Sequence, residues 1–388
     1  MGVDVAIVGG GVMGAAAAFW LTRLRPGLRV TVLERDPSHA QAATALSVAS
    51  IRQQFSNPLN VAISRFGLEV IRDFAGLVGP GAPALGLREN GYLFLAGPGS
   101  AAAMREAVAV QRAAGAATAL LDPGALAARF PWLDLDGVAL GSFGAEGEGW
   151  FDNMGLLAGF RDAARAQGAE WRRAEVAGVL TEGGRVTGVR LADGATLPAG
   201  AVVLAAGTRA AGLMAGLGAP WPVEPRKRTV FLIDAPDARH PDAPLLVDHT
   251  GFYLRPEGKH WICATVPEGD VATDVEDFEP ALEEFEEIVW PRLYARAPEF
   301  AAVKVLRAWA GQYDFNVLDQ NAIVGPHPGF PGLFVLSGFS GHGLQQAPAM
   351  GRGLAEVLLD GAYRTLDLAP LGVERVLAGR PFAERAVV

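Results

Sequence analysis

The chain has 388 residues, half of them hydrophobic and 19% charged, which is typical of a globular protein and not of a disordered one. Its length predicts two structural domains. The net charge of −9 argues against nucleic acid as a partner, because phosphate binding requires clustered Lys and Arg. The single cysteine, Cys263, excludes an internal disulfide framework and a cysteine-rich zinc site. The scattered histidines indicate no other metal site.

The opening segment predicts a strand, a turn, a helix and a second strand. Residues 3–8 form a β-branched apolar run, typical of a strand buried on both faces of a parallel sheet. A helix is expected over 15–24 and a second strand over 30–33. The uncharged stretch 5–22 carries four glycines in its middle, which suit a turn and spoil a membrane-spanning helix. We therefore expect a βαβ unit, no membrane span and a soluble, cytoplasmic protein.

The turn after the first strand carries a dinucleotide-binding fingerprint. Gly9, Gly11 and Gly14 fit the GxGxxG pattern, and Glu34 lies twenty residues beyond Gly14, after the second strand. These glycines permit a tight turn, approach of the backbone to a pyrophosphate and close packing of helix on strand. The helix N-terminus then offers N–H groups to the diphosphate, and the carboxylate accepts the ribose hydroxyls. The alternative is a glycine-rich turn without a ligand, and the fingerprint alone serves FAD and NAD equally.

The rest of the chain alternates between helices and short strands, with no internal repeat and no linker. Further helices are expected over 60–74, 101–114, 275–294 and 344–359, and further strands over 89–96, 201–206, 303–309 and 333–336. Hairpin turns are predicted at 183–184 and 193–194, and another at 256–258 within the β-rich stretch 229–266. Because no linker is visible, we expect domains that are joined by several crossings of the chain.

A second glycine-rich turn follows the last predicted strand. Residues 338–348 read GFSGHGLQQAP and join that strand to a helix. Small residues let the backbone approach a planar ligand, and the helix N-terminus places positive potential where a flavin gains negative charge on reduction. The strand 201–206, closed by Gly207, is either another cofactor-binding turn or a plain buried strand. The C-terminal turn favours FAD over NAD.

Six segments together carry a resemblance that covers nearly the whole chain. They are 9–14 with Glu34 and Arg35, 50–56, 206–207, 251–256, 309–311 and 338–348. In this order they resemble the D-amino-acid oxidase-type family of FAD-dependent amine oxidoreductases, above all sarcosine and proline dehydrogenase β-type subunits, D-arginine-type dehydrogenases and FAD-dependent oxidoreductase-domain proteins. The resemblance implies an α/β fold in which a discontinuous, Rossmann-like FAD-binding domain is interleaved with a substrate domain of mixed β-sheet and helices. The FAD-binding domain is expected over 1–78, 140–225 and 320–388, and the substrate domain over 79–139 and 226–319.

The resemblance also implies that FAD is bound non-covalently. Gly311 stands where sarcosine oxidases carry their flavin-linking cysteine, and the spacing of His39 differs from that of relatives that attach FAD through histidine. His342 is expected to contact the flavin through its backbone and not to act as a base. The residues assigned to FAD by the resemblance are Gly9, Gly11, Val12, Met13, Gly14, Glu34, Arg35, Ser47, Val176, Ala206, Gly207, Gly311, Gly338, Gly341, His342, Gly343, Leu344 and Gln345.

Four side chains are expected to face the substrate: Arg52, Tyr253, Tyr313 and Gln345. Arg52 matches the substrate-carboxylate arginine of sarcosine oxidases, and a guanidinium is the best bidentate partner of a carboxylate; without that match it would be read as a surface charge. Tyr253 matches a pocket tyrosine of D-arginine dehydrogenases, or is a cross-strand aromatic. Tyr313 and Gln345 replace an arginine and a lysine of relatives and could supply hydrogen bonds. Ile262 aligns with the lysine that assists reaction with oxygen, which favours a dehydrogenase over a fast oxidase.

The implied function is oxidation of an amine or amino acid related to sarcosine, proline or a D-amino acid. Hydride would pass to flavin N5 and leave an imine that water hydrolyses, while the protein positions the substrate and excludes water. A different class stays open, namely an FAD-stabilised binding or assembly protein with little catalytic activity, and an NAD-dependent enzyme is a third alternative. The likeness to β-type subunits allows for a partner subunit or a homo-oligomer.

Overall fold

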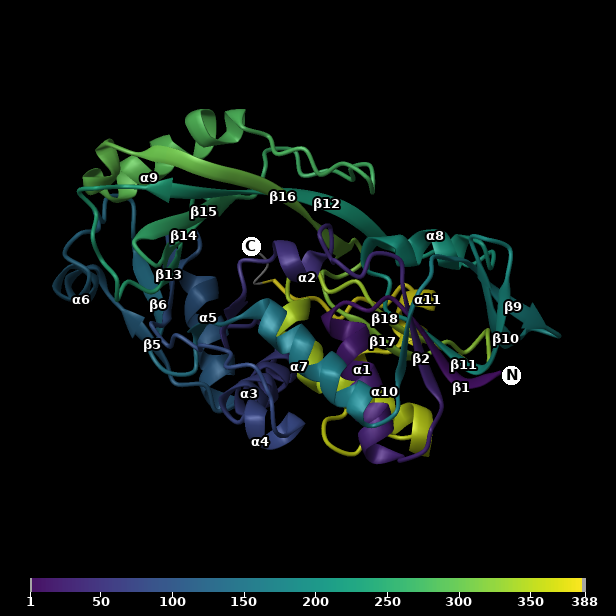
Figure 1. Ribbon diagram of the computed structural model, residues 1–388. Coiled ribbons are helices and arrows are strands. Elements are labelled where there is room, and N and C mark those ends of the chain that lie inside the picture. The colour runs from purple at the N-terminus through teal and green to yellow at the C-terminus, as the bar shows by residue number, and fades with distance from the viewer. Residues whose placement is uncertain (1, 386–388) are drawn as a thin grey trace.

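The computed structural model describes residues 2–385, which form two eight-stranded sheets and a two-stranded ribbon (Figure 1). The strands of the first sheet are β1 (Val3–Val8), β2 (Val30–Glu34), β8 (Glu170–Arg173), β9 (Val176–Glu182), β10 (Arg185–Leu191), β11 (Thr196–Leu204), β17 (Ile323–Pro326) and β18 (Leu333–Ser337). Their order is β17-β18-β11-β1-β2-β8, and the hairpin strands β9 and β10 extend from β11. The chain thus has the mixed α/β architecture expected from its sequence.

The centre of the first sheet is buried on both faces. β1 pairs in parallel with both β2 and β11, and Val5 lies opposite Val30 of β2. Along β1, Val5 and Ile7 belong to one hydrophobic core, whereas Ala6 and Val8 belong to the core on the other face. This alternation explains why the sequence of the strand is apolar at every position.

Helices cover both faces of this sheet. On one face lie α1 (Val12–Leu24), α3 (Pro58–Arg72), α7 (Asn153–Ala166) and α10 (Gly343–Asp360). On the other lie α8 (Ala210–Ala215) and α11 (Val373–Leu377). The remaining helical segments are α2 (Ala43–Leu46), α4 (Phe74–Val78), α5 (Ala101–Ala113), α6 (Pro123–Arg129), η1 (Gly207–Arg209), η3 (Pro298–Ala301) and η4 (Ala369–Leu371). No helix within residues 2–385 combines the length and the apolar character that a bilayer crossing requires.

The second sheet lies beside the first (Figure 1). Its strands are β4 (Tyr92–Ala96), β5 (Thr118–Leu121), β6 (Leu140–Gly144), β12 (Val223–Asp234), β13 (Leu245–Val247), β14 (Phe252–Glu257), β15 (His260–Thr265) and β16 (Lys304–Asn316). Their order is β16-β12-β15-β14-β13-β4-β6-β5, and all neighbours are antiparallel except β13 and β4. β12 begins with Val223 in a core of the first sheet and continues to Phe231 in the core of the second. The ribbon pairs β3 (Ser50–Ile51) with β7 (Gly149–Trp150).

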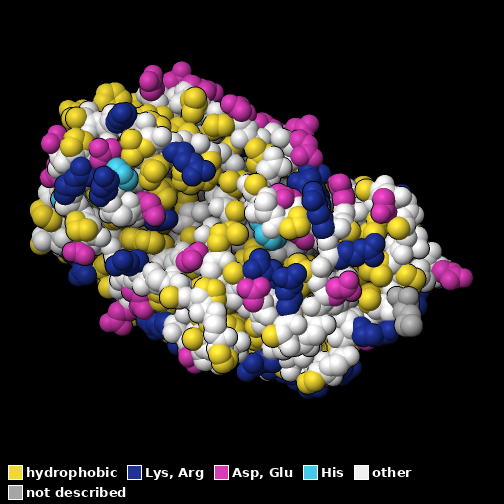
Figure 2. All heavy atoms as spheres, in the orientation of Figure 1, with side chains coloured by type: hydrophobic (Ala, Val, Ile, Leu, Met, Phe, Trp, Pro, Cys, Tyr) yellow, Lys and Arg dark blue, Asp and Glu magenta, His cyan; other side chains and the backbone are white. Residues whose placement is uncertain are grey.

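One predicted helix is formed only in part. The helix predicted over 275–294 is wrong in its first half: only η2 (Phe285–Val289), a turn of π-helix, and α9 (Trp290–Arg296) are helical. Upstream, the side chains of Asp274 and Asp277 accept backbone N–H groups two residues ahead, at 2.8 and 3.1 Å, and Pro280 follows. Such local bonds compete with the helix ladder. Acidic side chains gather along the upper edge of Figure 2, which this segment occupies in Figure 1.

The other predicted elements are confirmed, with ends that shift by a few residues, and the strand predicted over 303–309 continues to Asn316 as β16. β6 pairs with β4 and β5, so the strand at 140–144, which the sequence placed with the FAD-binding segments, belongs to the second sheet. The division into a cofactor domain and a substrate domain otherwise stays a prediction.

Candidate functional site

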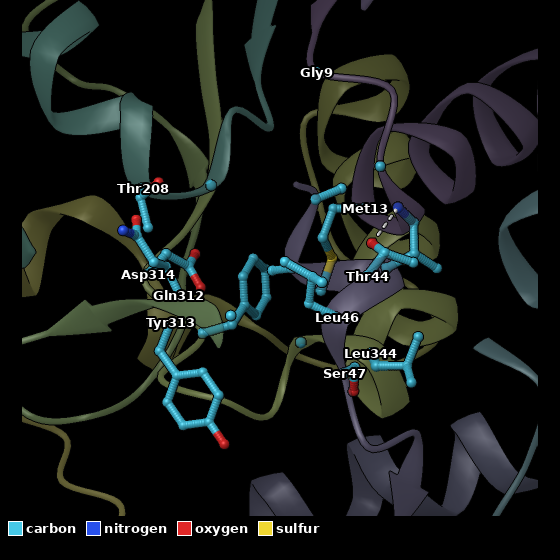
Figure 3. A pocket seen from close by; sticks show the side chains of 18 of the residues that line it. Gly9, Met13, Thr44, Leu46, Ser47, Thr208, Gln312, Tyr313, Asp314 and Leu344 are labelled. Carbon is cyan, nitrogen blue, oxygen red and sulfur yellow. Dashed lines mark hydrogen bonds between the residues drawn. The ribbon is translucent and has the colours of Figure 1, made fainter. Parts of the chain in front are cut away.

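A cavity of about 650 Å³ is lined by the ends of the first sheet and by β12 and β16 of the second. Figure 3 shows Met13, Thr44 and Leu344 on one side of it, facing Thr208 and Tyr313 on the other. All the residues predicted to bind cofactor or substrate line this cavity except Gly14 and Gly338. Segments far apart in the sequence therefore meet at one place.

The first glycine-rich turn holds the N-terminus of α1 against the cavity. A Cβ atom on Gly14 would lie 1.9 Å from the carbonyl oxygen of Gly9, so only glycine lets the helix pack this closely on the turn. Gly11 is the N-cap of α1, and the Thr44 Oγ1 atom, at the dashed line in Figure 3, accepts the N–H of Val12 at 3.2 Å. Gly11, Val12 and Met13 line the cavity. The positive end of the helix dipole is thus available to an anionic ligand such as a pyrophosphate.

Glu34, which was predicted to bind ribose, lines the cavity at the end of β2. Its carboxylate accepts the N–H of Gly10 at 2.7 Å and the N–H of Asp36 at 2.8 Å. Each carboxylate oxygen keeps a second lone pair, so ribose hydroxyls can still bind. The His39 Nδ1 atom lies 4.0 Å from Glu34, which places this histidine at the same side. Arg35 also lines the cavity and lies 4.0 Å from the carboxylate of Glu276.

The second glycine-rich turn packs on β16. Gly341 has a φ of +88°, and a Cβ atom there would lie 2.6 Å from the ring of Tyr313, so glycine is required on both counts. The Asp314 carboxylate accepts the N–H of Gly338 at 2.8 Å. Burial raises the pKa of Asp314 to about 6, and backbone hydrogen bonds oppose that shift. His342 is the N-cap of α10, so a second helix N-terminus opens on the same cavity.

Arg52 is buried and is not a surface charge. Its side chain lies in the turn after β3 and is 2% exposed. The Nη1 group donates to the carbonyl oxygen of Gln54, the Nη2 atom lies 3.1 Å from His342 Nε2, and the guanidinium carbon lies 4.2 Å from the centre of the Phe55 ring. Gln345, which was expected to face the substrate, also holds this turn, because its Oε1 atom accepts the N–H of Arg52 at 2.9 Å. The guanidinium is thus held rigidly at the cavity wall.

Three tyrosines line the cavity near Arg52: Tyr92, Tyr253 and Tyr313. Burial raises the pKa of all three, so their phenols stay neutral and can donate hydrogen bonds. Ile262 is buried in β15 and is not among the residues that line the cavity. The comparison with the oxygen-assisting lysine of relatives therefore rests on the sequence alignment.

Several lining residues were not predicted, among them Thr44, Arg228, Gln312 and Asp314. Arg228 forms a bidentate ion pair with Asp270 at 2.8 and 2.9 Å, and its guanidinium carbon lies 5.1 Å from the Tyr313 ring centre. Arg228 could have been predicted only from its pairing with Gly311 across β12 and β16, which the sequence alone does not reveal. Side chains alternate between faces along a strand, so the position of Gly311 and Tyr313 at the cavity would have pointed to Arg228.

The described part of the cavity wall contains no cysteine, and residues 2–385 contain no cluster suited to a metal ion. Cys263 is fully buried in β15, in the core of the second sheet, and burial raises the pKa of its thiol. In the described part of the chain no cysteine lines the cavity. Residues 2–385 also contain no group of three or more His, Cys, Asp or Glu side chains placed to hold a metal ion.

The cavity combines two helix N-termini with the Glu34 carboxylate and lies beside a second sheet. This arrangement is typical of flavin-dependent oxidoreductases. The sequence matches the family described as "FAD dependent oxidoreductase" (DAO) over residues 4–357, and the chain belongs to this family. It is 38% identical over 422 residues to "FAD-dependent oxidoreductase domain-containing protein 1" of Xenopus laevis, covering 99% of this chain and 85% of that protein. The Bos taurus protein of the same name is also 38% identical, over 99% of this chain and 87% of its own length.

Solved structures agree with this assignment. The L-proline dehydrogenase of P. horikoshii superimposes with a TM-score of 0.86 at 25% sequence identity, covering 98% of this chain and 99% of that one. The glycine oxidase of Geobacillus kaustophilus superimposes with a TM-score of 0.81 at 26% identity, covering 95% of this chain and 98% of that one. The fold is therefore shared over nearly the whole length.

Proposed function

We propose that this protein binds FAD non-covalently and oxidises an amine or amino acid that carries a carboxylate, as a dehydrogenase more than as a fast oxidase. The observation that carries the proposal is the position of Arg52. Its buried guanidinium lines the same cavity as the two glycine-rich turns. A substrate carboxylate bound there would lie beside the cofactor end that the C-terminal turn forms.

The residues of the cavity fit FAD. The close packing of Gly14 on Gly9 leaves the N-terminus of α1 open to a diphosphate, and the Glu34 carboxylate at the cavity would accept the ribose hydroxyls. Gly311, which has no side chain, lines the cavity where relatives carry a linking cysteine, and this supports non-covalent binding. When bound, FAD supplies a two-electron acceptor for the C–H bond beside the substrate nitrogen.

The protein side chains would bind and orient the substrate. Arg52 would hold its carboxylate by two charge-assisted hydrogen bonds, which fixes both the position and the direction of the molecule. The neutral phenols of Tyr253 and Tyr313 would donate hydrogen bonds to the same end or to the nitrogen. Both tyrosines and Arg52 are buried, so the wall they form excludes water from the reacting atoms.

The relatives support a substrate of the amino-acid class. Several of them are named as enzymes of proline, glycine or a D-amino acid, including the D-amino acid dehydrogenase of Cereibacter sphaeroides, which is 26% identical over 448 residues. Those names describe the relatives. For this chain we propose a small amino acid or N-substituted amino acid. The resemblance that places Ile262 where fast oxidases carry a lysine supports the dehydrogenase assignment.

Anaerobic bleaching of the bound flavin tests the proposal. The purified protein is mixed with sarcosine, proline, glycine and D- and L-amino acids, and absorbance near 450 nm is followed. At least one carboxylate-bearing compound should bleach the flavin, and the matching amide should do so far more slowly. A flavin that none of these compounds reduces would contradict the proposal and favour the binding or assembly role. Protein that takes up no FAD would contradict both.

A further inference from the structure

The buried carboxylate of Glu148 contacts the turn that carries Arg52 but does not line the cavity. Glu148 lies in the connection between β6 and β7 and is 1% exposed. In the ribbon of β3 and β7, Ile51 pairs with Gly149. Glu148 therefore lies one residue before the end of this ribbon, next to the turn that follows β3. Glu148 is not among the residues that line the cavity, so it reaches a ligand there only through other residues.

Glu148 holds the Arg52 turn by two hydrogen bonds. Its Oε1 atom accepts the backbone N–H of Gln53 at 2.7 Å, and its Oε2 atom accepts the side-chain amide of Gln54 at 2.7 Å. The Gln54 amide also donates to the carbonyl oxygen of Tyr92 at 2.9 Å, and its own Oε1 atom accepts from Ser142. Both residues that follow Arg52 are therefore fixed by a single carboxylate.

The same contacts reach the guanidinium. The Nη1 group of Arg52 donates to the carbonyl oxygen of Gln54, the residue whose side chain Glu148 binds. Burial raises the pKa of Glu148 to about 7, while its hydrogen bonds from Gln54 and Gln53 and the charge of Arg52 act in the opposite direction. The charge of Arg52 therefore favours the ionised form of the Glu148 carboxylate.

We propose that Glu148 is the positioning residue of Arg52: through Gln53 and Gln54 it holds the guanidinium in the orientation that binds a substrate carboxylate. This inference rests on the proposed function, because it assigns Glu148 a role in the carboxylate site. The role is one of orientation, because Glu148 does not line the cavity and acts through the turn that carries Arg52.

Binding of two unreactive probes to the FAD-loaded protein tests the inference. The probes are pyrrole-2-carboxylate and its neutral amide, pyrrole-2-carboxamide, and each dissociation constant is read from the shift of the flavin visible spectrum at pH 8.5. Glu148→Gln keeps the size of the side chain but replaces one of its two acceptor oxygens by an NH2 donor, so one of the two N–H groups loses its partner. We expect it to weaken carboxylate binding by about tenfold, the loss of one hydrogen bond to a charged group, and carboxamide binding by less than about twofold.

The Arg52→Met background separates positioning from general structure. In that background Glu148→Gln should cause no further loss of carboxylate affinity, because its effect passes through Arg52. Glu89→Gln is the matched control. Glu89 supports the same connection, since it accepts the N–H of Gly147 at 2.8 Å, but its other partner is the exposed Arg72. This variant should leave both dissociation constants within about twofold.

Three results would overturn the inference while leaving the carboxylate site in place. They are an unchanged carboxylate affinity in Glu148→Gln, an equal loss for both probes, and an equal loss with and without Arg52. If Glu148→Gln does not fold, Gln54→Met removes one of the two links, the hydrogen bond from the Gln54 side chain, and is judged by the same three criteria. A wild-type protein that binds the carboxylate no better than the amide, with no effect of Arg52→Met, would instead overturn the proposed function.

Discussion

The Nη2 atom of Arg52 lies 3.1 Å from the Nε2 atom of His342, although 290 residues separate the two in the chain. Arg52 follows β3 near the start of the chain, and His342 begins α10 near its end. The contact joins the turn proposed to bind substrate to the turn proposed to face the flavin. A change in one of them is therefore expected to alter the other.

Replacing Arg52 by lysine should lower kcat/KM for a carboxylate substrate by about 100-fold, mainly through KM. Lysine keeps the charge but loses the planar pair of N–H donors and the stacking on Phe55, and hydrogen bonds to charged groups contribute about 1.5–3 kcal/mol each. Steady-state kinetics with an artificial electron acceptor measures the effect. Equal kcat/KM values for the wild type and Arg52→Lys would show that no bidentate contact is made.

Gly14→Ala should lower both FAD affinity and thermal stability. The added Cβ would lie 1.9 Å from the Gly9 carbonyl oxygen, so α1 must move away from the turn. Overpacking of this kind costs about 1–3 kcal/mol. Thermal unfolding with and without added FAD measures both effects.

Gly212→Ala is the matched control for that change. Gly212 also lines the cavity, but it lies inside α8 and a Cβ there would meet no described atom within 4 Å. Alanine should therefore be neutral or stabilise the protein by up to about 1 kcal/mol, because it is a better helix former. Similar losses of FAD affinity in the two variants would argue against the assigned role of Gly14.

Stability should fall as pH rises through the range in which Asp314 titrates. The folded pKa is about 6 and the ordinary value is 3.8, so between them the folded protein holds a proton that the unfolded chain has lost. One such proton gives a slope of about −1.4 kcal/mol per pH unit. Asp314→Asn should remove this contribution between about pH 4 and 6, as measured by urea unfolding at several pH values. An unchanged slope in the variant would contradict the assignment.

Asp270→Asn should loosen the segment that follows β15. Asp270 makes a bidentate ion pair with Arg228, whose side chain is 5% exposed, so the substitution leaves a buried guanidinium without its carboxylate. Breaking a buried pair costs about 3–5 kcal/mol. Limited proteolysis should therefore cut within 266–282 faster than in the wild type.

Glu268→Gln provides the comparison for that experiment. Glu268 pairs with Arg292 at 3.4 Å, but its side chain is 78% exposed, so the pair contributes little. Its proteolysis rate should match that of the wild type. Equal acceleration in both variants would show that the Arg228 pair has no special role in holding the segment.

Local pattern made much of the fold predictable. The βαβ unit and its fingerprint lie within residues 3–34, and every signal used there depends on neighbours in the sequence. The hairpins at 183–184 and 193–194 are confirmed for the same reason. The helix predicted over 275–294 was wrong because acidic residues were read as a helix surface, whereas two aspartates bond their own backbone.

The parts of the site that escaped prediction depend on pairing between distant strands. Arg228 reaches the cavity because of the register of β12 with β16. Glu148 reaches Gln53 and Gln54, the residues after Arg52, because β3 pairs with β7. Neither register can be predicted from the residues on either side of these strands. Asp314 likewise gains its partner, Gly338, only through the tertiary fold.

The continuity of β12 between the two sheets limits how the protein can move. One continuous strand leaves the hydrophobic interior beneath one sheet and ends in that of the other, hydrogen-bonded to β16 along its length. A hinge between the halves would have to break this ladder, so the molecule is expected to respond to a ligand as one stiff body. The irregular stretch at 266–282 lines part of the cavity and is attached to β12 and β16 by side chains such as Arg228 and Gln312, so we expect it to move when a bulky nucleotide enters.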